Sequence, residues 1–120
     1  MKKEKTVDEL LALFEKHAMN HGEAMASGNS RKANYSHDKI LEAVHYLKKK
    51  NKLEALVVFY NHSNMSVRSW AACFLLPMYE KKSLKILKEI AGMNIPSVSF
   101  DAKMVIQEWK NGHLKDFYTL

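Results

Sequence analysis

The chain has 120 residues, of which 47% are hydrophobic and 27% charged, and its 19 basic and 13 acidic side chains give a net charge of +6. This length fits one domain, and this composition argues against an intrinsically disordered chain. The single cysteine, Cys73, excludes an internal disulfide, and the apolar segments are too short to span a membrane. The first residues include lysines, but acidic residues interrupt the apolar core that a signal peptide needs, so we expect a cytoplasmic protein.

The first predicted helix begins at a capping box, Thr6 with Glu9, and ends at Gly28. Its apolar face is predicted from residues at helical spacing, which are Val7, Leu10, Leu11, Phe14, Ala18, His21 and Met25. A second helical pattern follows and reaches a lysine-rich segment, with Ala33, His37, Ile40, Leu41, Val44 and Leu47 on its apolar face. Two helices joined by a short turn predict an antiparallel hairpin over residues 6–51, in which His21 faces His37.

The second half contains an internal repeat with an offset of 31 residues, because Ser66-Val67 and Ser97-Val98 each open an apolar helical pattern. Each copy has the order helix, polar turn, helix, and the four predicted helices cover residues 53–60, 67–79, 83–91 and 98–110. Paired helices at this repeat length are typical of solenoids. We therefore predict an all-α fold with a short HEAT-like α-α superhelix in one domain, residues 1–120. Repeat 1 covers residues 52–79, repeat 2 residues 80–112 and a C-terminal tail residues 113–120.

Three segments resemble a known family: "HGEAMASGNSRKANYSHDKI" (residues 21–40), "NHSNMSVRSWAACFLL" (61–76) and "AKMVIQEWKNG" (102–112). The second segment has the Asn-rich turn and the Val-Arg pair of HEAT repeats. From about Val7 to His113, the chain resembles a small bacterial HEAT-like family known as domain of unknown function twenty-nineteen. That family has no established activity, and some of its members resemble immunity proteins that mask a bacterial toxin domain.

The resemblance implies a non-enzymatic module that binds a protein partner, a cognate toxin domain. Many immunity proteins against nucleases are acidic, whereas this chain is basic. Its partner would therefore need an acidic face, or would be bound away from its nucleic-acid groove. Homodimerisation through the apolar end of a two-repeat solenoid stays open as well.

Seven residues are candidates for binding a partner: Arg68, Trp70, Glu108, Trp109, Glu23, Arg31 and Asn34. Arginine and tryptophan are favoured interface anchors, and the last three residues would support the surface near the first turn. Each candidate also has a structural interpretation. Arg68 could pair with Asp101 or Glu108, Trp70 could pack between helices, and the charges near the first turn, with Asp38, could brace the hairpin.

Two further functions stay open at this stage. A basic HEAT-like nucleic-acid-binding protein, by analogy with HEAT-like alkylpurine DNA glycosylases, would need its lysines on one face, namely Lys48, Lys49, Lys50, Lys52, Lys81, Lys82, Lys85 and Lys88. Alternatively, His17, His21 and His37 could converge on a metal ion, or His21 and His37 could form a polar layer within the hairpin.

The cysteine and the methionines are predicted to have structural roles. Cys73 lies within an apolar run and is predicted to be buried and inert. The scattered methionines are predicted to fill the core: Met19, Met25, Met65, Met78, Met93 and Met104. The sequence has no Gly-rich phosphate loop, nucleophile elbow, CxxC or HExxH motif. We therefore predict that the chain is not an enzyme and needs no cofactor.

Overall fold

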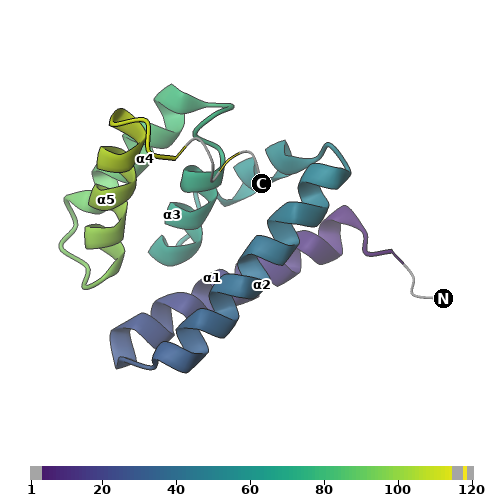
Figure 1. Ribbon diagram of the computed structural model, residues 1–120, viewed down its shortest axis with the longest axis horizontal. Coiled ribbons are helices and arrows are strands. Elements are labelled where there is room, and N and C mark those ends of the chain that lie inside the picture. The colour runs from purple at the N-terminus through teal and green to yellow at the C-terminus, as the bar shows by residue number, and fades with distance from the viewer. Residues whose placement is uncertain (1–3, 115–117, 119–120) are drawn as a thin grey trace. The chain divides into compact units, whose positions relative to one another are not determined.

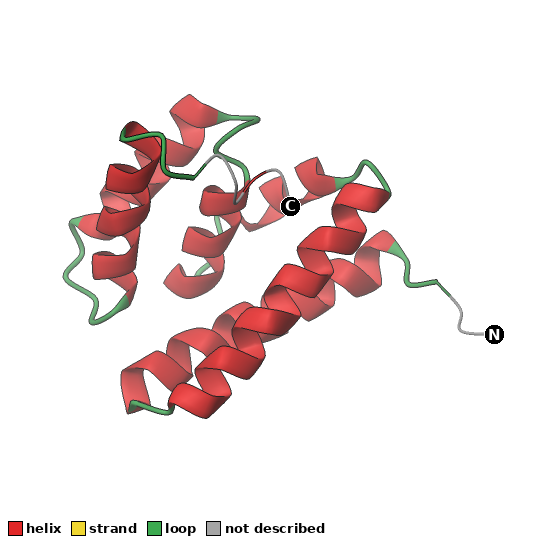
Figure 2. Ribbon diagram, in the orientation of Figure 1, coloured by secondary structure: helices red, strands yellow, loops and turns green. Residues whose placement is uncertain are grey.

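The computed structural model describes residues 4–114 and residue 118, and every regular element in these residues is helical (Figures 1 and 2). The elements are α1 (Val7–Ser27), α2 (Ser30–Lys49), the 3₁₀ helix η1 (Leu53–Phe59), α3 (Met65–Phe74), α4 (Glu80–Ala91) and α5 (Val98–Lys110). The predicted all-α class is thereby confirmed. The chain divides into two compact units, Met1–Leu56 and Val57–Leu120. Within the described residues, no helix has the length and apolar character that crossing a membrane requires.

Capping side chains define both helices of the first unit. The backbone N–H of Glu9 donates to Thr6 Oγ1 at 3.1 Å, and the backbone N–H of Thr6 donates to the Glu9 carboxylate at 2.9 Å. Gly28 ends α1 with a φ of 71°, a left-handed conformation that glycine adopts without steric cost. The next residue, Asn29, caps α2 by accepting the backbone N–H of Lys32 at 3.0 Å. Two residues therefore suffice to reverse the chain between α1 and α2.

The helices α1 and α2 pack against each other along their length, with Phe14 of α1 and Ile40 of α2 fully buried. The predicted neighbours His21 and His37 have ring centroids 6.4 Å apart. The predicted apolar face of α1 was wrong at one end, because Met25 is 39% exposed whereas His17 and Ala24 are buried. Leu10, Phe14 and His17 follow at spacings of four and three residues, and Ala24 lies seven residues, or two helical turns, after His17, which places residue 24 rather than residue 25 inside.

In the second unit, α4 packs against both α3 and α5. The hydroxyls of Tyr60 and Ser83 lie 2.7 Å apart in a buried hydrogen bond that joins the residue after η1 to α4. Ser99 Oγ donates to the Ile90 carbonyl at 2.7 Å and accepts the backbone N–H of Ile95 at 2.8 Å. These hydrogen bonds fix the turn between α4 and α5, since they satisfy backbone groups that the helices leave unpaired.

Three predicted helices of this half differ from the observed ones. The helix predicted at residues 83–91 is α4, which begins three residues earlier, at Glu80. Residues 53–60 were expected to form an α-helix, but residues 53–59 form the 3₁₀ helix η1, and the adjacent β-branched Val57 and Val58 disfavour a regular α-helix. The helix expected at residues 67–79 is α3, which ends at Phe74. Pro77 has no N–H to donate to the Cys73 carbonyl and disfavours continuation of the helix. This carbonyl accepts the backbone N–H of Leu76 at 3.3 Å and the Tyr118 hydroxyl at 2.6 Å.

The prediction for the methionines needs correction, and the prediction for the C-terminal tail lies partly outside the described residues. The methionines do not all fill the core, because five of the six are at least 37% exposed: Met19, Met25, Met78, Met93 and Met104. The helix predicted at residues 98–110 is α5, with the same bounds. Of the tail predicted at residues 113–120, residues 115–117 and 119–120 lie outside the described residues.

Candidate functional site

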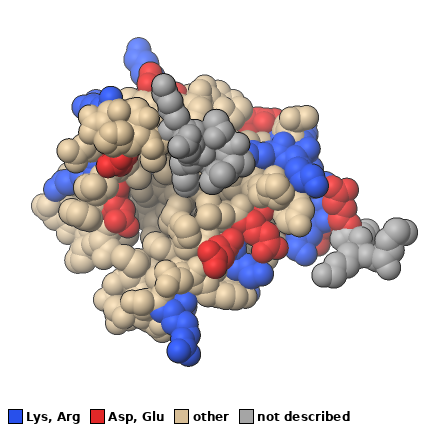
Figure 3. Space-filling view, viewed as in Figure 1, with Lys and Arg blue, Asp and Glu red and all other residues tan. Residues whose placement is uncertain are grey.

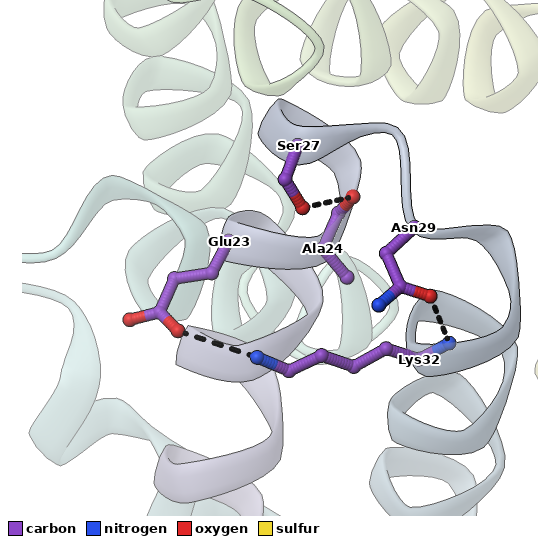
Figure 4. Close-up of polar contacts among 5 residues, drawn as sticks. All are labelled: Glu23, Ala24, Ser27, Asn29 and Lys32. Atoms are coloured by element: carbon purple, nitrogen blue, oxygen red, sulfur yellow. Dashed lines mark hydrogen bonds and ion pairs between the residues drawn. The ribbon is translucent and has the colours of Figure 1, made fainter.

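Glu23, one of the three candidates near the first turn, forms an ion pair with Lys32 that joins α1 to α2 (Figure 4). The Glu23 carboxylate lies 3.6 Å from Lys32 Nζ, while Ser27 Oγ donates to the Ala24 carbonyl at 3.3 Å. Both ion-pair side chains are substantially exposed, so the pair contributes little to stability. The candidates Arg31 and Asn34 are exposed on α2. An ion pair that braces the first turn was expected. Its basic residue is Lys32, which was not among the candidates.

Arg68 is largely enclosed by the second unit. Its Nε donates to the Tyr60 carbonyl at 2.6 Å, and its Nη2 lies 3.3 Å from the Glu89 carboxylate of α4. Only 16% of its side chain is exposed. An ion pair with a neighbouring carboxylate was one of the two roles expected for Arg68. Asp101 or Glu108 was the expected partner, and the structure shows an ion pair with Glu89. Arg68 therefore connects the turn before α3 to α4.

The two candidate tryptophans are partly buried and contact neighbouring side chains. The Trp70 ring stacks on Phe74, one turn further along α3, with centroids 5.8 Å apart and an interplanar angle of 19°. Trp109 Nε1 donates to the Glu80 carboxylate at 2.7 Å, and its ring meets Tyr118 edge to face at 5.7 Å. Both rings retain some exposed surface. Each could therefore contribute to an interface without leaving its present position.

A row of side chains on the outer side of α5 combines apolar exposure with one of the candidate residues. Phe100 is 64% exposed and Met104, one turn later, is 37% exposed. Glu108 follows after another four residues, and its carboxylate lies 2.8 Å from His113 Nδ1. Residues four apart share one face of a helix, so Phe100, Met104 and Glu108 form a continuous row, here called the α5 row. Sequence reasoning missed Phe100 and Met104, although their spacing from Glu108 could have revealed them.

The three histidines do not form a common ligand set. His21 and His37 are neighbours, but the ring of His17 meets Tyr35 instead, with centroids 5.8 Å apart. Among the residues that the structure describes, no three His, Cys, Asp or Glu side chains are grouped closely enough for a metal ion. His21 and His37 are neighbours, as the second interpretation of these residues expected, and their hydrogen bonding in a polar layer stays a prediction.

Cys73 is buried, and its burial raises the pKa of the thiol to about 12. The thiolate is the reactive form of cysteine, so the thiol of the folded protein is inert at neutral pH. This matches the expected role of Cys73 as part of the apolar core.

The lysines expected to bind nucleic acid lie in two different units of the chain. Lys81, Lys85 and Lys88 are exposed at helical spacing on α4. In the first unit, by contrast, Lys50 Nζ lies 3.2 Å from the Glu4 carboxylate. On the face drawn in Figure 3, acidic side chains lie beside basic ones rather than in a separate patch. Lys81, Lys85 and Lys88 thus form a basic row on α4.

Comparison with known proteins identifies one match. The model of the family described as domain of unknown function (DUF2019) matches residues 8–109. No curated protein matches the chain, and neither does any solved structure.

Proposed function

The chain belongs to the DUF2019 family, and on this premise we propose that it is a non-enzymatic protein-binding module built from HEAT-like helical repeats. Its partner is a bacterial toxin domain, which it neutralises by direct binding, as the immunity proteins that the family resembles do. The observation that supports this proposal most is the α5 row, where Phe100 is 64% exposed on a helix.

The local structure of the second unit supports the HEAT-like arrangement. Asn64 Oδ1 accepts the backbone N–H of Val67 at 3.1 Å and so begins α3 directly after a short polar turn. Val67 and the small residues Ala71 and Ala72 are fully buried, which lets neighbouring helices approach closely. Consecutive helices pack on one another, α3 on α4 and α4 on α5. Such nearest-neighbour packing is what repeat proteins share.

The α5 row has the composition of an interface anchor. An exposed aromatic ring next to a methionine offers apolar area, and methionine adapts its shape to a partner. Glu108 adds a charge at one end of the row, where a basic group of the partner would pair with it. On α5, only Ser99 and Ala102 are buried, so most of this helix retains some exposed surface. A folded domain with an apolar pocket and one basic group opposite Glu108 fits this row.

Affinity capture from native lysate, with the full chain as bait, tests the proposal. We expect one protein to be retained at both low and moderate salt, and to contain a toxin domain. The double variant Phe100→Ser with Met104→Lys should lose this protein. The matched control is Val58→Ser, because Val58 is 63% exposed but lies far from α5 in sequence and outside the row. Both changes affect exposed side chains, so the folded state should tolerate them.

Other outcomes would contradict the proposal. Capture of nucleic acid that moderate salt releases would favour the basic alternative and its α4 row, Lys81, Lys85 and Lys88. Capture of a second copy of the chain alone would make α5 a self-association surface. Equal retention of a protein partner by the double variant and the control would place binding elsewhere.

A further inference from the structure

A cavity of about 300 Å³ lies between α1 and α2, and all its lining residues belong to the first unit. Apolar side chains form part of its wall, among them Leu10, Leu13 and Ala43. The polar groups around it come from Lys5, Lys16 and His17 and, at spacings of three or four residues along α2, from Tyr35, Lys39, Glu42 and Tyr46. The volume is at the lower end of the range for small-molecule sites, about 300–1,000 Å³.

His17 lines this cavity, and only 6% of its surface is exposed. Within the described part of the chain, no hydrogen-bond partner reaches its buried Nδ1. Burial lowers the pKa of His17, and the charges of Lys16 and Lys39 lower it further, so the ring is neutral at pH 7. A neutral imidazole has one donor and one acceptor nitrogen, and buried polar groups are almost always hydrogen-bonded. A molecule in the cavity would lie beside this ring, and its contact with the buried Nδ1 requires a small movement of the side chains that cover that atom.

The charged groups around the cavity favour an anion. Three ammonium groups and one carboxylate line it, a net charge of +2, and they belong to Lys5, Lys16, Lys39 and Glu42. Lys39 Nζ lies 3.3 Å from Glu42 and 5.7 Å from the centre of the Tyr35 ring, so its charge is compensated within the protein. Lys5 and Lys16 supply the excess positive charge. Tyr35 and Tyr46 add ring surface and hydroxyl groups beside it.

From this cavity we propose that the α1–α2 hairpin binds a small organic anion, a carboxylate or phosphate monoester attached to an apolar body. The apolar body packs against the leucines and tyrosine rings. The anionic head lies near Lys16 and Lys5. His17 Nδ1, which no described residue binds, is buried, so a neighbouring side chain moves aside when the anion reaches it. This site lies on a different unit from the α5 row, so it does not depend on the proposed partner.

A titration of the full-length ¹⁵N-labelled chain, followed by NMR, tests the proposal with three probes: phenyl phosphate, phenylacetate and the uncharged benzyl alcohol. We expect one or both anions to shift the amides of α1 and α2 around the cavity in a saturable way, and benzyl alcohol not to. Saturation by phenyl phosphate alone would identify a phosphate monoester site. Saturation by phenylacetate alone would identify a carboxylate site.

Two variants and a control separate the cavity from general attraction to a basic surface. His17→Phe keeps an aromatic ring but removes both nitrogens, and it should weaken anion binding about tenfold. Lys16→Gln should weaken it severalfold, whereas Lys49→Gln, an exposed lysine outside the cavity lining, should not. If His17→Phe does not fold, the two lysine variants still decide the question. Equal losses for Lys16→Gln and Lys49→Gln, equal binding of benzyl alcohol, or the absence of saturable shifts at the cavity would overturn the proposal.

Discussion

Replacing Arg68 with methionine tests whether this residue stabilises the second unit. Arg68 Nε donates to the Tyr60 carbonyl at 2.6 Å, and Nη2 lies 3.3 Å from Glu89. A hydrogen bond to a charged group contributes about 1.5–3 kcal/mol. The ion pair adds less than about 1 kcal/mol, because the Glu89 side chain is 44% exposed and solvent screens the interaction. Arg68→Met keeps most of the apolar stem, so we expect a loss of about 2 kcal/mol in the free energy of unfolding.

Urea denaturation measures this loss, and two further variants separate its causes. Glu89→Gln removes only the ion pair and should cost less than about 1 kcal/mol. Arg68→Lys keeps the charge but lacks the Nε–H group, so it should lose nearly as much stability as Arg68→Met. The reasoning is refuted if Arg68→Met changes the free energy of unfolding by less than about 0.5 kcal/mol, a change typical of surface substitutions. A cost for Glu89→Gln equal to that of Arg68→Met would assign the effect to the ion pair instead.

Three other predictions concern the turn, the thiol and the buried histidine. Gly28→Ala should destabilise the chain by about 1 kcal/mol in urea denaturation, and Gly28→Asn by less, because φ is 71° at this position. Nothing within 4 Å would meet an added Cβ, so the loss comes from the backbone conformation alone. Equal stability of all three proteins would contradict this conformation. Cys73, with a pKa raised to about 12, should react with a thiol reagent only at the rate of unfolding; rapid stoichiometric labelling of the native protein would show that the thiol is accessible. The pKa of His17 is lowered from 6.5 by burial, so the unfolded state binds the proton more readily and the stability of the fold falls as the pH drops through about 6.5. His17→Phe should therefore lose less stability than the wild type between about pH 7 and pH 5. Identical losses in both proteins would refute this role of the histidine.

The sequence predicted the helices best where capping residues mark their ends. Thr6 and Glu9 form the expected capping box, and Gly28 ends α1. The bounds of α5 were also predicted correctly, although the side chain of its N-cap, Ser97, makes no capping hydrogen bond. The prediction failed where a local steric effect competes with the apolar pattern. Apolar residues continue past Phe74, but Pro77 cannot donate the next helical hydrogen bond, so α3 ends there.

The candidate site was harder to predict, because side-chain contacts depend on tertiary packing. Arg68 was identified as important, yet its hydrogen bond to the Tyr60 carbonyl depends on the course of the chain between η1 and α3. The exposure of Phe100 was not predicted, since an apolar residue in an amphipathic helix is usually buried. His17 was considered only as a metal ligand. Its burial follows from the three-to-four spacing of Leu10, Phe14 and His17, which the sequence already contains.

The affinity of the purified chain for its captured partner tests the proposed function most directly. If the α5 row is the interface, Phe100→Ser and Met104→Lys should each weaken binding at least tenfold, as expected for central apolar anchors that contribute about 1.4 kcal/mol or more. The control Val58→Ser should bind like the wild type, because Val58 is exposed outside the row. Unchanged affinity of both α5 variants, with the partner still bound by the wild type, would contradict the assignment of the binding surface.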